Sequence, residues 1–311
     1  MSYIEPMATN WEPILRNWAK SPSETEDQKR DKTELQIRDA LKASSALSKM
    51  GYRVYVKGSY ANNTNVRLDY DVDIAVECTD FYYVDPIAAV ADVKKVAAIE
   101  RLQNWTPKYT KEEFKDAVGT ALTEYFGSKA LSQGNMAYRV REKKTTLPAD
   151  VVPCFQYHYI WDVNSQGDPL YYEGSRIYPP KGDYVHNWPK QQLVCGVTKN
   201  DATGRRYKRM VRILKRIENE LVKADAMAEL PSFFMECLVY NVPNDCFNHD
   251  TYVQDMRHVL ATIFNQTLDS KKCEKWLEAS ERKYLFHSSQ SWTVEDAHEL
   301  SSKAWKLLGY S

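Results

Sequence analysis

Apolar positions in the first part of the chain follow helical spacing in one segment and strand spacing in the next two. From Ile37 to Leu47 they recur every three or four residues, which predicts a helix. Residues 52–56 and 71–77 alternate apolar and polar side chains, the pattern of half-buried strands. Helical spacing returns at 111–126, where Phe114 begins an apolar face. Strands that pack against helices are therefore predicted.

The rest of the chain divides into a strand-forming region and a helical region. Residues 136–160 predict two strands around a polar turn at 142–146. Residues 161–200 are rich in Tyr, Pro, Gly and Asp, which predicts an irregular connection. A mixed α/β lobe is therefore predicted, followed by an all-helical lobe, with the junction near 195–204. The helices of the second lobe are expected at 204–224, 231–242, 251–265 and 293–308.

Two carboxylates interrupt the strand predicted at 71–77. Because side chains alternate faces along a strand, Asp71 and Asp73 share one face, whereas the apolar residues Val72, Ile74 and Val76 form the other. Two negative charges this close repel each other unless something neutralises them. One interpretation is an edge strand with a solvated acidic face. The other is a site for a divalent cation, for which carboxylates are suitable hard-oxygen ligands.

Two neighbouring features favour the cation site. Gly58 and Ser59 end the preceding strand, where a glycine lets the backbone approach a phosphate and a serine hydroxyl can donate to it. The segment LPADVVP at 147–153 places a third acid, Asp150, among apolar strand residues. Three strand carboxylates beside a Gly-Ser turn are the residue types that two-metal phosphoryl transfer requires.

With these residues the sequence resembles the DNA polymerase-β-like nucleotidyltransferase superfamily and, within it, the bacterial cGAS/DncV-like nucleotidyltransferases. The resemblance rests on Gly58-Ser59, DVDIAV at 71–76 and ADVVP at 149–153, and it extends over residues 30–245. It implies an α+β fold in which a nucleotidyltransferase core with a small mixed sheet occupies residues 1–198. An all-helical C-terminal lobe would occupy residues 199–311, with the active site in the cleft between the two.

The resemblance also implies roles for the residues that carry it. Asp71 and Asp73 would bind both Mg²⁺ ions, for which Mn²⁺ could substitute. Asp150 would complete the ion near the acceptor hydroxyl, and Ser59, next to Gly58, would contact the donor triphosphate. All three acids would thus be both metal ligands and catalytic residues.

The helix predicted at 204–224 carries a basic side opposite its apolar side. Arg212 and Lys215 are three residues apart and therefore neighbours on that side, and Lys208 precedes them by about one turn. A solvated basic face is one interpretation. The other interpretation is a triphosphate-binding site, and it comes from the resemblance. VRILK at 211–215 is similar to the segment that binds the triphosphate in oligoadenylate synthetases and cGAS/DncV-like enzymes.

Ser232 and Phe233 open the next predicted helix. Ser232 is at the position where an N-cap is expected, and a plain cap is the simpler interpretation. The resemblance implies instead a serine that contacts the triphosphate and an aromatic residue, Phe233, that stacks on a base.

Composition narrows the class of partner and the cellular location. The chain has 42 basic and 42 acidic residues, so no overall field attracts a long nucleic acid or an anionic membrane. Neither a signal peptide nor a membrane-spanning run is recognisable, which predicts a cytoplasmic protein. The six cysteines and six histidines show no zinc-ligand spacing. The zinc element of animal cyclic GMP-AMP synthase is not matched, which argues against double-stranded DNA as the activator.

The predicted activity is the condensation of nucleoside triphosphates, with ATP and GTP as the expected ones, into a cyclic di- or trinucleotide. The resemblance implies a second messenger of bacterial anti-phage defence that acts on a separate effector protein, with accessory regulatory proteins as further candidate partners. Two alternatives stay open. One is an enzyme that makes linear oligonucleotides or adds nucleotides to RNA, and the other is a catalytically silent, nucleotide-binding scaffold.

Overall fold

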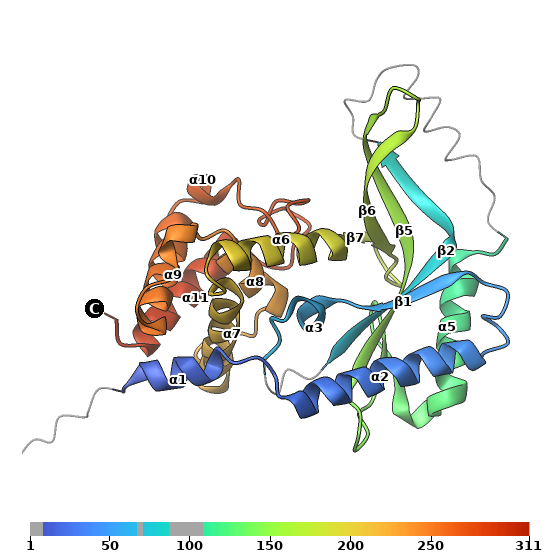
Figure 1. The fold of residues 1–311 in the computed structure, drawn as a ribbon, viewed down its shortest axis with the longest axis horizontal. Coiled ribbons are helices and arrows are strands. Elements are labelled where there is room, and N and C mark those ends of the chain that lie inside the picture. Colours follow the sequence, from blue (N-terminus) through green and yellow to red (C-terminus); the bar gives the residue numbers. More distant parts are fainter. Residues whose placement is uncertain (1–8, 67–70, 87–107, 311) are drawn as a thin grey trace, which may run out of the picture. The chain divides into compact units, whose positions relative to one another are not determined.

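The structure is a computed structural model that describes residues 9–66, 71–86 and 108–310 (Figure 1). The chain forms two compact units. One is built around a β-sheet and comprises Ser23–Tyr60 and Asp69–Lys190. The other is helical and comprises Met1–Pro22, Ala61–Leu68 and Gln191–Ser311. We refer to them as the sheet unit and the helical unit.

A mixed seven-stranded sheet forms the centre of the sheet unit. Strands β1, β2, β5, β4 and β3 lie side by side in this order, and β6 pairs with the second half of β5 and with β7. β2 and β5 run parallel, whereas every other described pair is antiparallel. The predicted small mixed sheet is confirmed. Its first five strands are β1 (Tyr52–Val56), β2 (Val72–Pro86), β3 (Leu131–Gln133), β4 (Tyr138–Val140) and β5 (Ala149–Val163).

Helices α2 (Glu24–Ala43) and α5 (Lys111–Phe126) pack with one face of this sheet. The helix α5 was expected from its apolar spacing, whereas α2 overlaps the helix expected from Ile37 to Leu47 but begins earlier and ends at Ala43. Leu41 of α2 and Phe114 of α5 are buried in one cluster with Ile74 of β2 and Val151 of β5. The side chains that alternate with these strand residues therefore lie on the opposite face. A short helix, α3 (Gly58–Asn62), follows β1, and a 3₁₀ turn, η1 (Ser128–Ala130), precedes β3.

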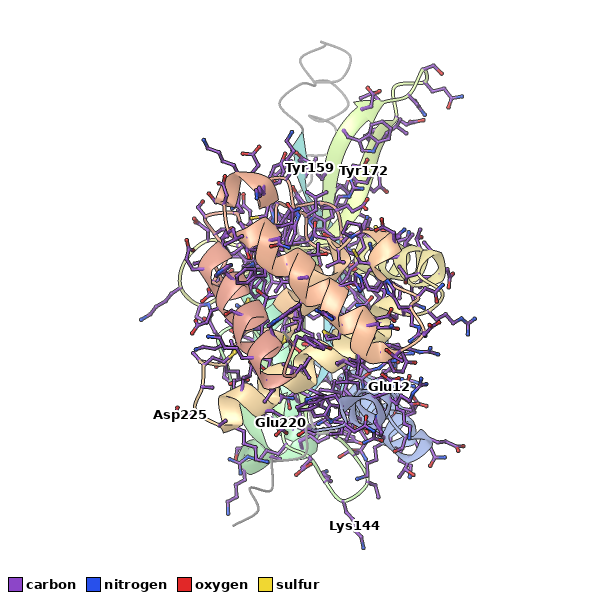
Figure 2. The ribbon with its side chains drawn as sticks, turned by 90° about the vertical axis from the view of Figure 1, so that its left-hand side faces the viewer. Glu12, Lys144, Tyr159, Tyr172, Glu220 and Asp225 are labelled. Atoms are coloured by element: carbon purple, nitrogen blue, oxygen red, sulfur yellow. The ribbon has the colours of Figure 1, made fainter. Side chains whose placement is uncertain are left out.

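The region 161–200 is not the irregular connection that its composition predicts. It contains β6 (Pro169–Ile177), β7 (Val185–Asn187) and α6 (Pro189–Ala202). Tyr159 of β5 lies directly opposite Tyr172 of β6 (Figure 2). Gly174 of β6 leaves room for Trp188, whose ring would lie 2.8 Å from a Cβ at that position. The tyrosines and Gly174 of β6 pack within the sheet and do not form turns. Amino-acid composition alone does not distinguish these two cases.

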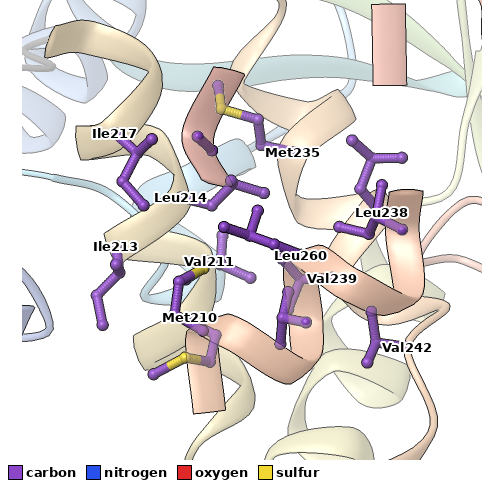
Figure 3. Close-up of a cluster of buried hydrophobic side chains, with 14 of the residues drawn as sticks. Met210, Val211, Ile213, Leu214, Ile217, Met235, Leu238, Val239, Val242 and Leu260 are labelled. Carbon is purple, nitrogen blue, oxygen red and sulfur yellow. The ribbon is translucent and has the colours of Figure 1, made fainter. Parts of the chain in front are cut away.

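Helix α7 (Tyr207–Lys223) contributes much of the core of the helical unit. Its apolar side packs with α8 (Ser232–Tyr240) and α9 (Tyr252–Thr267), and Figure 3 shows Leu214 in one buried cluster with Leu238 and Leu260. The helices predicted between 204 and 308 are confirmed. None of the described helices is both long and apolar enough to cross a membrane. The unit also contains α1 (Trp11–Trp18), η2 (Asn244–Cys246), α10 (Ser270–Cys273) and α11 (Val294–Leu307).

Two segments from the N-terminal part of the chain belong to the helical unit, although the division 1–198 and 199–311 assigns them to the core. Leu15 of α1 and Ala19 are buried in the same cluster as α7, because the apolar side of α1 packs against α7 and α9. The segment Ala61–Leu68 is also part of this unit. The structure changes from the sheet unit to the helical unit at residues 190–191. The division at 198–199 into functional domains stays a prediction.

Candidate active site

Asp73 is the second residue of β2 and lies on the sheet face opposite α2 and α5, and Asp71 immediately precedes the strand. Val72 and Ile74 are fully buried in the core, so alternation along the strand turns Asp73 to the other side. Asp71 is exposed and Asp73 is half-buried. β2 lies between β1 and β5, so the interpretation of this segment as an edge strand with a solvated acidic face is wrong.

Asp150 is brought to the same face by the parallel pairing of β2 with β5. Asp73 and Asp150 are direct partners in the register of the two strands. Neighbouring strands are about 4.8 Å apart, and paired residues direct their side chains to the same face. Asp150 is half-buried, and its Oδ1 lies 3.2 Å from Nε of Arg139. The sheet thus brings Asp73 and Asp150 together on one face, and the third predicted acid, Asp71, immediately precedes the strand that carries Asp73.

Gly58 holds the backbone close to Asp73. The amide of Lys57 donates to the carbonyl oxygen of Asp73 at 2.9 Å, which extends the pairing of β1 with β2 to this point. Gly58 has a φ of +66°, and a Cβ there would lie 2.2 Å from Oδ2 of Asp73. Both the positive φ and this close approach require glycine. Ser59 follows as the second residue of α3 and is half-buried.

The three acids fit a divalent cation by their chemistry. Carboxylate oxygens are the ligands that Mg²⁺ and Mn²⁺ prefer, and two of the acids are in register on adjacent strands. Their side chains do not meet at a single point, however. Among the residues that the structure describes, no three His, Cys, Asp or Glu side chains converge on one metal position.

The basic side of α7 is not a solvated face at the two positions predicted to bind a triphosphate. Arg212 is 4% exposed and Lys215 is 2% exposed. Nε of Arg212 donates to the carbonyl oxygen of Ala19 at 2.9 Å, and its Nη1 donates to that of Asn63 at 2.5 Å. Burial lowers the pKa of Arg212 to about 10, so the guanidinium is charged at neutral pH. Its contacts join α7 to α1 and to the segment that follows α3.

Glu236 of α8 holds the same segment from another side. It is 2% exposed, and it accepts a hydrogen bond from the hydroxyl of Thr64 and another from the amide of Gln192, both at 2.8 Å. The sequence suggests an ion-pair partner at Glu236 and no role for Thr64 or Asn63. The pattern Asn-Asn-Thr-Asn at 62–65 is typical of a turn and was the one signal of this segment in the sequence. The structure agrees, because Asn63 has a φ of +53°.

The remaining predicted residues of the helical unit lie on α7 and α8. Lys208 is half-buried, and burial lowers the pKa of its ammonium group although Glu236 opposes the shift. The N-cap of α8 is Pro231, so the prediction that Ser232 is the N-cap is wrong, and Ser232 is instead the first helical residue. Phe233 packs against the core of this unit, and its ring meets that of Trp292 edge-on at 6.3 Å.

Comparison with known proteins of similar sequence shows the family to which the chain belongs. Residues 195–309 match the family model of the cGAS/DncV-like nucleotidyltransferase C-terminal helical domain. The chain is 36% identical over 304 residues to the cyclic dipyrimidine nucleotide synthase CdnE of Legionella pneumophila, which covers 97% of this chain and 99% of that protein. The chain belongs to the cGAS/DncV-like nucleotidyltransferases.

Other members of the cGAS/DncV-like family are similar over the whole chain. The cyclic dipurine nucleotide synthase of Elizabethkingia meningoseptica is 34% identical over 303 residues, covering 96% of this chain and 98% of that protein. The solved structure of the Rhodothermus marinus CdnE c-UMP-AMP synthase with Apcpp and Upnpp has a TM-score of 0.80 and 30% identity, and covers 96% of this chain and 98% of that one. The α+β fold predicted from the resemblance is therefore confirmed.

A separate cavity in this cGAS/DncV-like nucleotidyltransferase contains none of the predicted site residues. It has a volume of about 650 Å³ and lies between α5 and the β3–β4 hairpin. Gly119 and Thr123 of α5 line it together with Ser132 of β3 and Tyr138 of β4. Tyr138 alternates with Arg139, which contacts Asp150, so this cavity is on the other side of β4 from the acids.

Proposed function

We propose that this cGAS/DncV-like nucleotidyltransferase condenses nucleoside triphosphates into a cyclic dinucleotide. The observation that carries the proposal is the register of β2 and β5, which sets Asp73 and Asp150 side by side, with Asp71 immediately before β2. The relatives support the product class, because those from L. pneumophila, E. meningoseptica and R. marinus are all named as synthases of cyclic dinucleotides.

The chemistry we propose divides between metal ligands and phosphate-binding side chains. Asp71, Asp73 and Asp150 would hold the divalent cations, as is general in this family. When bound, Mg²⁺ supplies positive charge that promotes ionisation of the acceptor hydroxyl and neutralises the phosphates. The hydroxyl of Ser59 donates to the donor triphosphate, and Gly58 keeps the backbone close to the acids.

The proposed roles in the helical unit divide between residues that would contact the nucleotide and one that holds a neighbouring segment. Lys208 and Lys215 supply charge to the triphosphate, which a charge-assisted hydrogen bond would stabilise. Ser232 and Phe233 are proposed to contact the phosphate and the base, as the family resemblance implies. Arg212 already donates to two carbonyl oxygens, so we propose that it acts mainly through the segment that it holds.

The bases of the product are left to experiment. The dipyrimidine synthases of L. pneumophila and Cecembia lonarensis are 36% and 33% identical to this chain, and the dipurine synthase of E. meningoseptica is 34% identical. These values do not separate pyrimidine from purine substrates. The expectation of ATP and GTP is therefore widened to all four nucleoside triphosphates.

One incubation tests the proposed activity. The protein is supplied with four labelled nucleoside triphosphates and Mg²⁺ or Mn²⁺, and the products are treated with phosphatase and identified by mass spectrometry. We expect a phosphatase-resistant product whose mass is that of a closed dinucleotide, because a ring has no terminal phosphate. A label that appears as a growing ladder on added RNA would support the RNA-tailing alternative, and no product from any mixture would support the silent scaffold.

Salt dependence provides a second discrimination between these enzymes. An enzyme that follows a long RNA neutralises many phosphates, so its activity falls steeply with salt. The equal numbers of basic and acidic residues favour a small substrate. We therefore expect the activity to fall only mildly between low and physiological salt.

We further propose a cytoplasmic role in anti-phage defence, in which the product activates a separate effector protein. The support is the family resemblance, and accessory regulatory proteins are included on the same basis. Plaque counts test this role in bacteria that carry the gene with its neighbouring genes. We expect Asp73→Asn to restore phage plating to the level of cells without the gene, and unchanged protection by this variant would contradict the proposal.

A further inference from the structure

Four charged residues form a row across the face of the sheet that carries the acids. Asp73 and Asp150 occupy the middle, as partners in the parallel pairing of β2 and β5. Arg139 of β4 lies directly opposite Asp150 in the antiparallel pairing of β4 with β5. Lys57 continues β1 opposite Asp73, where its amide donates to the Asp73 carbonyl. The order of charges along the row is therefore positive, negative, negative, positive.

The side chain of Lys57 lies on this face as well. Burial raises the pKa of the Cys154 thiol, and the charge of Lys57 opposes this rise. Cys154 follows Asp150 on β5 by four residues, an even number, so its side chain lies on the same face as that of Asp150. Each of the two central carboxylates thus has a cation on its outer side.

Arg139 makes a direct contact with its neighbouring carboxylate. Its Nε lies 3.2 Å from Oδ1 of Asp150, and the two side chains are 64% and 21% exposed. A guanidinium has five N–H donors, so it can orient a carboxylate while its other donors stay in water. Because Arg139 is mostly exposed, it can also release Asp150 without leaving a buried, unpaired charge.

We propose that Arg139 is a positioning residue that neutralises and orients Asp150 until a divalent cation takes its place. The inference rests on the proposed function, which makes Asp150 a metal ligand. Cation binding then exchanges one positive partner of Asp150 for another, and Arg139 returns to solvent.

The exchange predicts that Arg139 competes with the metal ion. The test is the affinity of the nucleotide-free protein for Mn²⁺, measured by electron paramagnetic resonance of the unbound ion. Arg139→Ala removes the competing cation, so we expect it to bind Mn²⁺ about two- to fivefold more tightly than wild type, the range that an exposed ion pair supplies. The gain is expected to shrink as salt rises, because exposed charges are screened.

Matched variants separate competition from a general effect on the hairpin. Arg141→Ala removes an exposed arginine two residues after Arg139, at a position where the backbone amide donates to the carbonyl oxygen of Ala130. This variant is expected to bind Mn²⁺ with the affinity of wild type. Arg139→Lys keeps the charge and is expected to stay within about twofold of wild type. In an Asp150→Asn background, Arg139→Ala is expected to give no gain in Mn²⁺ affinity, because Arg139 affects Mn²⁺ binding through Asp150.

The outcomes distinguish the inference from the proposed function. An affinity of Arg139→Ala that equals or falls below that of wild type overturns the inference, and so does an equal gain in Arg141→Ala. The proposed function has its own readout, which is the phosphatase-resistant product of the wild-type protein. If that product forms while the Mn²⁺ affinities of wild type and Arg139→Ala are equal, only the role of Arg139 is refuted.

Discussion

Asp71→Asn and Asp73→Asn are each expected to reduce formation of the cyclic product below about one percent of wild type. Each change removes one proposed ligand of the divalent cation, whose charge stabilises the transition state by several kcal/mol. Since about 1.4 kcal/mol corresponds to a tenfold change in rate, such a loss exceeds a hundredfold. Product formation is measured by the phosphatase assay under saturating Mg²⁺.

The same variants are expected to keep their fold. Asparagine retains the shape of the side chain and removes the repulsion between neighbouring carboxylates, so the melting temperature in EDTA should hold or rise. Asp116→Asn, which changes an acid on α5, is the control and is expected to keep full activity. Substantial turnover by either Asp71→Asn or Asp73→Asn would show that the two-metal mechanism is wrong.

Gly58→Ala is expected to lower activity about a hundredfold although it adds a single methyl group. The new Cβ would lie 2.2 Å from Oδ2 of Asp73, so the carboxylate or the backbone must move. A displacement of about 1 Å at a reacting group can have an effect of this size. The variant also places alanine at a φ of +66°, which costs about 1–2 kcal/mol of stability.

Gly127→Ala separates the two effects of that substitution. Gly127 has a φ of +83° in the same unit, and a Cβ there meets nothing within 4 Å. Gly127→Ala should therefore lose stability in thermal unfolding through its backbone conformation alone and keep its activity, whereas Gly58→Ala should also lose activity and Mn²⁺ affinity. Equal activity in the two variants would mean that the contact with Asp73 is unimportant for catalysis.

Local pattern was enough to predict most of the elements. The helices α5, α7 and α9 and the strands β1 and β2 follow from apolar spacing, since the periodic apolar side of each packs into one of the two large cores. The pattern failed in region 161–200, where the tyrosines and Gly174 of β6 pack within a sheet that extends beyond its apolar core. Whether such residues form a turn or an outer strand depends on their partners, and those lie elsewhere in the sequence.

In the candidate site, too, residues marked by their local sequence could be predicted, whereas residues marked only by distant partners could not. Asp71, Asp73 and Asp150 could be selected because acids among apolar strand residues require a reason, and the structure pairs Asp73 with Asp150 on neighbouring strands. Arg139 and Thr64 could not be selected, because an arginine in a short strand and a threonine in a turn are ordinary. Their significance comes from the facing residues, Asp150 and Glu236, which only pairing and packing reveal.

The assignment of Ala61–Leu68 to the helical unit has a consequence for synthesis on the ribosome. This segment leaves the ribosome early, shortly after Ser59, but Arg212 and Glu236, which hold Asn63 and Thr64, are among the last third of residues to be translated. Domains that consist of contiguous sequence can fold as they emerge. Here the turn that follows the proposed phosphate-binding serine must wait for α7 and α8. An unfinished chain that already contains all three acids therefore still lacks the anchors of this turn, which ties the ordering of the turn to the synthesis of α7 and α8.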